Sequence, residues 1–260
     1  MTNSIWLSEL FVLGDQFGFS ERLIRTSLQR LSADGWVSSE RVGRRSRYSL
    51  TNEAAQETAD AETRIYGRPA VEWDGQWTIV LLDWPERPAA ARDRLIRHLR
   101  WQGFVPLGRS VMASPVAAAT DTDPFVVTDA GDPPVGVLRG RLEDLSALTE
   151  AAAFDSAFEL DTMADSYEAF VDRWSVWRSG AQALAGPEAW VLRTMLVHDF
   201  RRIRLREPNV PQQLRPSSWA GDDALELAGA IYRAVAPATS AWLVEVLALD
   251  SPPAQADRFA

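Results

Sequence analysis

The segment 20–50 constrains the fold of this chain more than any other part of its sequence. Residues 20–34 begin with Ser, a common helix cap, carry apolar residues at helical spacing and end at Asp-Gly. Two short alternating runs, 36–40 and 46–50, flank a basic turn that contains glycine, which indicates a β-hairpin. Apolar spacing over 3–13 predicts a preceding helix. The order helix, turn, helix, hairpin is typical of a winged helix-turn-helix, whose second helix enters the major groove of DNA.

The second of these helices is amphipathic. Its apolar residues Leu23, Ile24, Leu28 and Leu31 form one stripe. The opposite face carries Arg22, Arg25, Thr26, Gln29 and Arg30. The basic turn and the strand after it add Arg44, Arg45 and Arg47.

Charge separates this region from the rest of the chain. Residues 22–47 hold seven arginines and two acids, a net charge of +5, whereas the remainder holds 20 arginines and 34 acids, a net charge of −14. A protein with a pI near 4.9 is repelled by polyphosphate, so one concentrated basic patch indicates a face that approaches it. Every cation is arginine, which forms bidentate contacts with phosphate and guanine.

We therefore predict that the five polar residues of the helix and the three arginines at the turn and in the strand after it bind double-stranded DNA. Arg25 and Gln29, early in the helix, are the best candidates for contacts to base edges. Arg44, Arg45 and Arg47 suit phosphate or minor-groove contacts. The alternative interpretation is that they form only the solvated face of an amphipathic helix and an exposed hairpin tip.

The rest of the chain predicts an α+β fold with further domains. After the winged helix-turn-helix (1–51), a connecting helix and linker (52–68) lead to a ferredoxin-like α/β domain (69–144) and a helical domain (145–260). In the central domain we expect a strand over 77–84, a helix over 88–102, and strand-like segments at 105–112, 125–128 and 135–142. In the last domain we expect helices at 145–153, 160–180, 187–205, 222–235 and 239–249, an insert at 207–219 and a frayed tail, SPPAQADRFA.

Composition excludes several classes of site. The chain has no cysteine, so disulfides, thiolate zinc sites and a cysteine nucleophile are excluded. Its two histidines, His98 and His198, are 100 residues apart, which argues against a histidine-rich metal centre. Glu9 interrupts the first apolar run, which is therefore part of a helix and not a signal peptide, and no apolar run approaches the roughly 18 residues of a membrane span. We expect a cytosolic protein without a cofactor or a membrane contact.

Three motifs, in the right order along nearly the whole chain, resemble the PaaX family of bacterial regulators, named for repression of phenylacetic acid catabolism operons. They are Glu21–Thr51, Arg64–Glu86 and Leu196–Val235. The resemblance implies a homodimeric repressor on a pseudo-palindromic operator, with a central domain similar to the small ferredoxin-like nucleases of CRISPR adaptation. It also implies an effector, an aryl-coenzyme A thioester such as phenylacetyl-CoA, which releases the operator.

This sequence departs from the family pattern in two places. Members usually have one more helix before the equivalent of Ile5–Leu13. They also usually carry Asp-Pro and Leu-Leu-Pro where this chain has Glu207-Pro208 and Leu214-Arg215-Pro216. If the second segment lines the effector site, the added arginine would change ligand preference.

Candidate effector residues follow from the chemistry of such a ligand. Arginines can bind the phosphates of coenzyme A, and an aryl group needs an apolar, aromatic cavity. The candidates are His198, Arg201, Arg202, Arg204, Arg215 and Trp219. The alternative is that these arginines pair with acids such as Asp199 and Glu207 in an interdomain network.

Two other functions remain open. Nucleases related to the central domain place a metal-binding acid where this chain has Asp83, so a metal-dependent nuclease is possible; a single carboxylate is also explained as a cap of the turn before Pro85. The other function is a regulator that responds to protein partners and binds no ligand.

Overall fold

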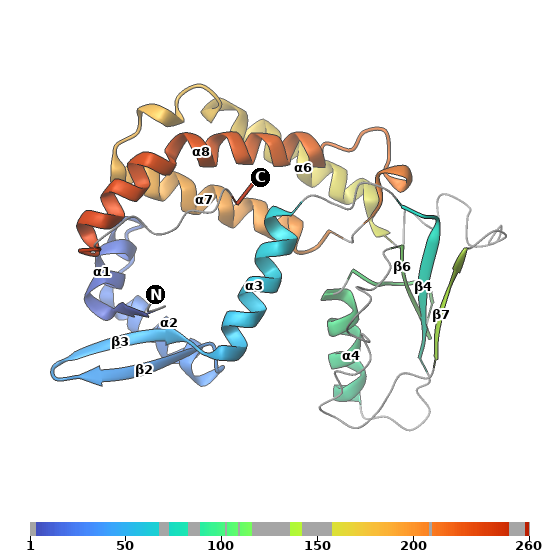
Figure 1. The fold of residues 1–260 in the computed structure, drawn as a ribbon, viewed down its shortest axis with the longest axis horizontal. Coiled ribbons are helices and arrows are strands. Elements are labelled where there is room, and N and C mark those ends of the chain that lie inside the picture. Colours follow the sequence, from blue (N-terminus) through green and yellow to red (C-terminus); the bar gives the residue numbers. More distant parts are fainter. Residues whose placement is uncertain are drawn as a thin grey trace. The chain divides into compact units, whose positions relative to one another are not determined.

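The chain folds into two compact units (Figure 1). Unit 1 contains Met1–Gly67, Phe170–Arg201 and Asp223–Ala260, and unit 2 contains Arg68–Ala169 and Arg202–Asp222. The structure is a computed structural model that describes residues 4–67, 73–82, 89–101, 103–108, 110–115, 136–141, 158–207, 210–249 and 258–259. No helix in these ranges is long and apolar enough to cross a membrane.

The start of unit 1 has the predicted order of helices and hairpin. Its elements are β1 (Ser4–Trp6), α1 (Leu7–Asp15), α2 (Glu21–Ala33), β2 (Val37–Val42) and β3 (Arg45–Leu50). The strands form an antiparallel sheet in the order β1-β3-β2. Val42 pairs with Arg45, so the hairpin loop is Gly43-Arg44, and Gly43 has a φ of +61°, as the first residue of a type II′ turn requires.

The predicted helix over 3–13 is wrong at its beginning. Ile5 and Trp6 belong to a strand because they pair with Tyr48 and Arg47 of β3. The helix begins at Leu7, where the backbone N–H of Trp6 donates to Glu9 Oε2 at 2.8 Å. The tertiary pairing with β3 thus overrides the helical spacing of the apolar residues.

Helix α3 (Asn52–Tyr66) confirms the predicted connecting helix. The hydroxyl of Thr51 accepts a hydrogen bond from the N–H of Ala54 (3.2 Å) and donates one to the carbonyl of Gly35 (2.7 Å). One side chain therefore caps α3 and also joins it to the turn that follows α2.

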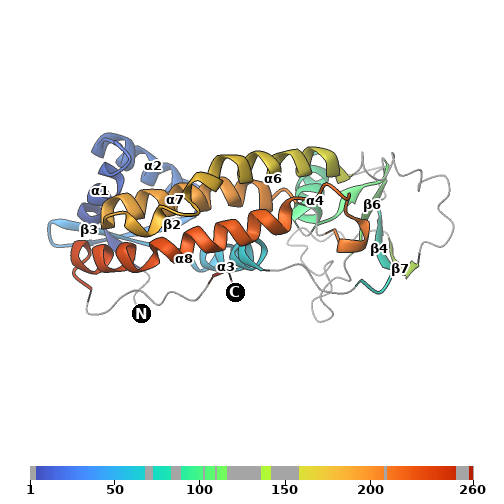
Figure 2. The ribbon, with the colours of Figure 1, turned by 90° about the horizontal axis from the view of Figure 1, so that it is seen from above.

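The C-terminal part of the chain is helical, as predicted, with α6 (Leu160–Trp174), α7 (Gly186–Arg204) and α8 (Gly221–Val246) (Figure 2). The helix predicted over 160–180 ends at Trp174 and gives way to two short 3₁₀ turns, Ser175–Trp177 and Ala181–Ala183. The expected break between 235 and 239 is wrong, because α8 continues through Pro237. Val235, Thr239 and Leu243 are buried on one face, so packing holds both sides of the proline in one helix.

The frayed tail is also a wrong prediction for its last described residues. Phe259 is only 5% exposed and packs against Tyr66, Phe200 and Tyr232. Burial of an aromatic ring explains the order at this point in the chain.

Unit 2 contains a four-stranded antiparallel sheet in the order β5-β6-β4-β7. Its elements are β4 (Gln76–Leu81), α4 (Ala89–Trp101), β5 (Val105–Pro106), β6 (Val111–Ser114) and β7 (Gly136–Arg141). The stretch 105–112, predicted as one strand-like segment, is a hairpin of β5 and β6. This strand order, with α4 between the first two strands, agrees with the predicted ferredoxin-like domain. The predictions at 125–128 and 145–153, and Asp83, lie outside the described residues.

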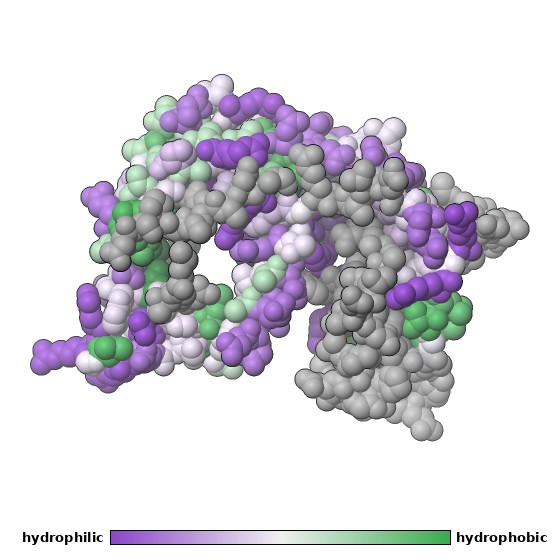
Figure 3. Space-filling view, viewed as in Figure 1, coloured by the Kyte–Doolittle hydropathy of each residue, from purple (hydrophilic) through white to green (hydrophobic). Residues whose placement is uncertain are grey.

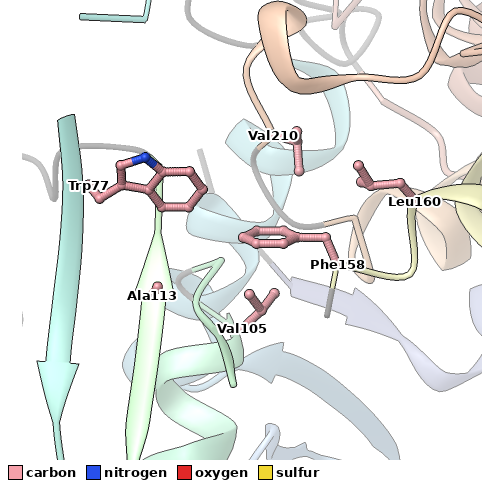
Figure 4. Close-up of a cluster of buried hydrophobic side chains, with 6 residues drawn as sticks. All are labelled: Trp77, Val105, Ala113, Phe158, Leu160 and Val210. Atoms are coloured by element: carbon pink, nitrogen blue, oxygen red, sulfur yellow. The ribbon is translucent and has the colours of Figure 1, made fainter. Parts of the chain in front are cut away.

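A buried apolar cluster packs on this sheet (Figure 4). It consists of Trp77, Val105, Ala113, Phe158, Leu160 and Val210. The ring of Phe158 lies 6.1 Å from that of Trp77 in an edge-on arrangement. Residues after position 144 thus help to build the core of the sheet, since apolar burial joins segments that are distant in sequence.

Candidate nucleic-acid interface

Helix α2 presents its polar face to solvent. Its cap is Ser20, whose hydroxyl accepts a hydrogen bond from the N–H of Leu23 at 3.3 Å. All five predicted DNA-binding residues of the helix are exposed: Arg22, Arg25, Thr26, Gln29 and Arg30. The hydroxyl of Thr26 donates to the carbonyl of Arg22 (2.9 Å), which leaves its oxygen as an acceptor.

Arg25 is oriented by two neighbours. Its guanidinium carbon lies 4.8 Å from the centroid of the Phe11 ring of α1, and its Nη2 lies 3.6 Å from Glu21 Oε2. The side chain is still 54% exposed, so the ion pair contributes little free energy. The stacking on Phe11 therefore directs an arginine that is still able to bind another molecule.

The hairpin arginines share one aromatic platform. Arg45 and Arg47 are two residues apart in β3, so both point to the same face, and their guanidinium carbons lie 5.2 and 5.7 Å from the Trp6 ring centroid. Arg44 sits in the turn, exposed, and has no ion-pair partner in the described ranges. Figure 3 shows a mostly hydrophilic surface over the hairpin.

Arg47 is the most constrained of the three. Its Nη2 lies 2.8 Å from Glu40 Oε2, its cross-strand partner, and its side chain is 33% exposed. Of the three arginines Arg44, Arg45 and Arg47, Arg47 is therefore the most constrained by its neighbours and Arg44 the least. Arg41, on the opposite face of the hairpin, donates from Nε to the Gly43 carbonyl at 3.4 Å.

The apolar stripe predicted on α2 is only partly buried. Leu28 is 9% exposed, whereas Leu23 is 50% and Leu31 is 40% exposed. Phe19 and Trp36, which flank the helix, are also exposed. The described contacts of α2 with other elements are mainly those to α1 and β2, which cover one part of the stripe.

A buried polar network lies in unit 2. The Tyr167 hydroxyl and the Arg204 guanidinium both donate to Glu207 Oε2, and Glu207 is 4% exposed. Burial, reinforced by the Glu207 charge, raises the pKa of Tyr167 well above its ordinary value. Burial opposes the charge of Arg204, but the Glu207 carboxylate outweighs it and raises the pKa of the guanidinium.

Two more of the predicted effector residues adjoin this network. The centroid of the Trp219 ring lies 5.3 Å from that of the Tyr167 ring. The guanidinium carbon of Arg215 also lies 5.3 Å from the centroid of the Trp219 ring. Arg215 is 6% exposed in its side chain, bonds the Val210 carbonyl at 2.9 Å and pairs with Asp222 at 3.2 Å. Arg204, Arg215 and Trp219 are thus brought together through Tyr167 and Glu207.

The other three predicted effector residues are not part of this cluster. His198, Arg201 and Arg202 are exposed on α7. Asp199, expected to pair with the nearby arginines, instead lies 3.0 Å from Arg173 Nη1 and 3.3 Å from Trp174 Nε1. The alternative interpretation, pairing of these arginines with acids, holds for Arg204 and Glu207.

Sequence reasoning missed Trp6 and Tyr167. Trp6 is a cross-strand partner of Arg47, which only the strand pairing reveals. Tyr167 lies 40 residues before Glu207, and no spacing rule connects the two. Among the described residues, no group of three or more His, Cys, Asp or Glu side chains could hold a metal ion.

Comparisons with known proteins cover most of the chain. Residues 1–54 match the family model described as PaaX-like protein, residues 70–152 match the PaaX protein central Cas2-like domain, and residues 158–245 match the PaaX-like protein C-terminal domain. The transcriptional repressor PaaX of Escherichia coli (strain K12) is 34% identical over 254 residues, which are 93% of this chain and 77% of that protein.

A solved structure shares the fold. It is the uncharacterized protein Rv0674 from Mycobacterium tuberculosis, with a TM-score of 0.56 and 20% identity over 90% of this chain and 89% of that one. At this identity the likeness concerns the fold alone.

Proposed function

Because this chain belongs to the PaaX family of transcriptional repressors, we propose that residues 1–51 are its winged helix-turn-helix and hold the operator. The chain is a DNA-binding regulator, and the role of its named relative is not enzymatic. In this proposal α2 enters the major groove and the β2–β3 hairpin touches the backbone or the minor groove.

One observation carries the proposal: the exposed polar face of α2 and the arginine face of the hairpin belong to a segment of net charge +5 in an acidic chain. Arg25 and Gln29 read base edges, with Arg22, Thr26 and Arg30 beside them. Arg44, Arg45 and Arg47 bind phosphates or enter the minor groove. The stacking of arginines on Phe11 and Trp6 supports this division, since it lowers the cost of orienting them.

In this proposal residues 52–260 set the position of the DNA-binding surface on the operator. We infer a linker at 52–68, a ferredoxin-like domain at 69–144 and a helical domain at 145–260 that dimerises and binds an effector. A homodimer presents two copies of α2 to two half-sites, and a ligand that favours a different dimer arrangement removes this match.

The effector in this proposal is an aryl-coenzyme A thioester of the phenylacetyl-CoA type. His198, Arg201 and Arg202 are exposed and could meet its phosphates. Arg204, Arg215 and Trp219, which lie together around Tyr167 and Glu207, are the other candidates. The operon that the protein represses in this proposal encodes enzymes of aromatic-acid catabolism.

The test is a salt-controlled titration of the whole protein with a fluorescent duplex taken from upstream of its own gene. Wild type should bind it more tightly than a random duplex, and phenylacetyl-CoA, but not coenzyme A alone, should weaken binding. Arg25→Ala/Gln29→Ala should lose the preference, while Arg178→Ala, an exposed arginine outside the basic segment, should keep it. Equal binding by all three proteins would refute the assignment of the DNA surface.

A further inference from the structure

The end of the chain inserts an aromatic ring into unit 1. The Phe259 ring lies 4.9 Å from that of Tyr66 on α3, 5.3 Å from Tyr232 on α8 and 5.7 Å from Phe200 on α7. Gly229 on α8 makes room for it, because a Cβ there would come within 3.0 Å of Phe259 Cβ. The three rings thus form a cage of a size that suits one phenyl group.

Arg258 and the Phe259 carbonyl make the polar contacts of these last residues. Arg258 Nη1 lies 3.0 Å from Glu62 Oε1, but both side chains are about two-fifths exposed, at 41% and 42%. The Phe259 carbonyl accepts one hydrogen bond, from Arg233 Nη1, at a long 3.4 Å. The guanidinium carbon of Arg258 also lies 5.5 Å from the centroid of the Tyr66 ring. Since the exposed Arg258–Glu62 pair contributes little, the buried Phe259 ring and the contact of Arg258 with Tyr66 are the main interactions of these last residues.

The arginine Arg193 lies beside the cage. The Arg193 guanidinium carbon lies 5.5 Å from the Tyr232 ring and 5.6 Å from the Trp190 ring. Arg193 Nη1 and Trp190 Nε1 are buried and have no hydrogen-bond partner in the described ranges. Burial lowers the pKa of Arg193, and the nearby positive charge of Arg258 lowers it further, while the phenol groups of Tyr232 and Tyr66 oppose this shift. Buried donors of this kind are costly unless an acceptor reaches them.

We propose that the Phe259 ring occupies the binding site of an aromatic ligand that carries an anionic or carbonyl acceptor, and that the Phe259 ring and this ligand exclude each other. The phenyl group of the ligand replaces the ring of Phe259 between Tyr66, Phe200 and Tyr232. Its acceptor receives hydrogen bonds from Arg193 and Trp190. The proposal deepens, and rests on, the proposed control by an aryl effector, which it assigns to a site outside the six residues named from sequence.

The position of the cage explains how such an exchange reaches the DNA-binding surface. Tyr66 is the last residue of α3, and α3 begins directly after Thr51, at the end of the hairpin. When a free ligand takes the place of the Phe259 ring, the contact between Phe259 and Tyr66 is lost. The last turn of α3 is then held by the ligand and no longer by another part of the chain. The ligand then needs no contact with the arginines of α2 to affect them.

The experiment uses the full chain and its lack of cysteine. A single Ala260→Cys substitution introduces the only thiol of the chain, which is labelled with an environment-sensitive dye at the position next to Phe259 in sequence. The probes are phenylacetyl-CoA, phenylacetate and coenzyme A, so that thioester and free acid are distinguished. We expect at least one phenyl-bearing probe to shift the dye signal towards the solvent-exposed value, and coenzyme A to leave it unchanged.

The second measurement is calorimetric affinity for the same probes. Phe259→Ala should bind the active probe about tenfold more tightly or better, because the competing ring is gone and the site is free in a larger fraction of molecules. Arg178→Ala, a control at an exposed arginine that leaves the ring and its neighbours in place, should change affinity by less than about threefold. Arg193→Met should lose most of the binding in either background.

The outcomes separate this inference from the proposed function. If the probes bind wild type, the dye does not respond and Phe259→Ala gains nothing, the ligand site lies elsewhere and the inference is wrong. If no probe binds any variant while DNA binding is intact, it is wrong as well. A responding dye with no DNA binding supports the site and contradicts the repressor proposal. The dye measurement needs no change at Phe259, so it stands even if Phe259→Ala fails to fold.

Discussion

Arg47 and Trp6 face each other across β3 and β1, and the guanidinium carbon lies 5.7 Å from the indole centroid. Arg45 uses the same ring from 5.2 Å. One tryptophan therefore orients two cations on the same face of the hairpin. Ordering them before binding reduces the side-chain entropy that contact with a polyanion costs.

Trp6→Leu should weaken DNA binding without removing any charge. The two arginines each lose a cation–π contact of about 0.5–1 kcal/mol, a total of about 1–2 kcal/mol, so affinity should fall by at most roughly fivefold to thirtyfold. The slope of log affinity against log salt should stay the same, because the number of arginines does not change. Fluorescence anisotropy over a salt series measures both. Trp36→Leu, at an exposed tryptophan of the same unit, is the control, and an equal loss there would argue against a platform role.

Arg25→Ala should reduce affinity for the operator by about 1–3 kcal/mol and relax discrimination at one base-pair position. The reason is that a side chain stacked on Phe11 and directed into solvent suits bidentate recognition of a base edge. Competition with a set of single-base operator variants measures the change. Arg25→Lys keeps the charge but not the planar fork, so it should resemble alanine in specificity. Wild-type specificity in Arg25→Lys would assign the residue to phosphate.

Arg44→Ala should weaken binding to operator and random DNA to the same extent. The residue sits in the turn, has no ion-pair partner in the described ranges and suits a phosphate contact. Loss of one such contact lowers the salt slope by about 1. Parallel titrations of both duplexes at several salt concentrations test this, with Arg178→Ala as the control that leaves the slope unchanged. A change confined to the operator would contradict the assignment.

Tyr167→Phe should destabilise the protein at neutral pH by about 1–3 kcal/mol, because buried Glu207 loses a donor. The pKa of Tyr167 is raised on folding, so its contribution is complete below the unfolded value of about 10 and is lost as pH rises above that value. The free-energy difference between wild type and variant should therefore shrink towards high pH. Urea denaturation at pH 7.5 and pH 10.5 measures it. A difference that grows with pH would contradict the direction of the shift.

Gly221→Ala should destabilise unit 2. A Cβ at this position would lie 2.4 Å from Trp219 Nε1 and 3.1 Å from Tyr167 Cε2, so the aromatic pair must move. Overpacking of this kind costs about 1–3 kcal/mol. Gly180→Ala is the control, since a Cβ there meets nothing within 4 Å. Thermal denaturation compares them, and equal midpoints would show that the ring pair adapts freely.

Local chemistry made the hairpin and α2 predictable. The glycine-containing turn, the Ser20 cap and the alternating strands all act within a few residues, and the polar face of α2 is exposed as its periodicity predicts. The Arg204–Glu207 pair is three residues apart and was foreseen as an alternative for the same reason. The assignment of these faces to DNA stays a prediction.

Long-range packing accounts for the failures. Strand β1 forms because Ile5 and Trp6 meet β3, more than 40 residues later. The core face of α8 outweighs Pro237, and an aromatic cage orders Phe259 in a polar tail. None of these partners can be located from spacing along the chain.

The two hydrogen bonds of the Thr51 hydroxyl connect the orientation of α3 to the turn that follows α2. Because one oxygen both caps α3 and bonds the Gly35 carbonyl, the start of α3 is joined to the turn that follows α2, and a tilt of α3 acts on that turn. With its 15 residues, α3 is about 22 Å long. A swing of roughly 10° at its far end would then displace the near end by about 4 Å, close to the rise of one base pair along a DNA strand. In the homodimer that we propose, a rearrangement too small to unfold any element would thus be enough to move the two α2 helices out of register with their half-sites.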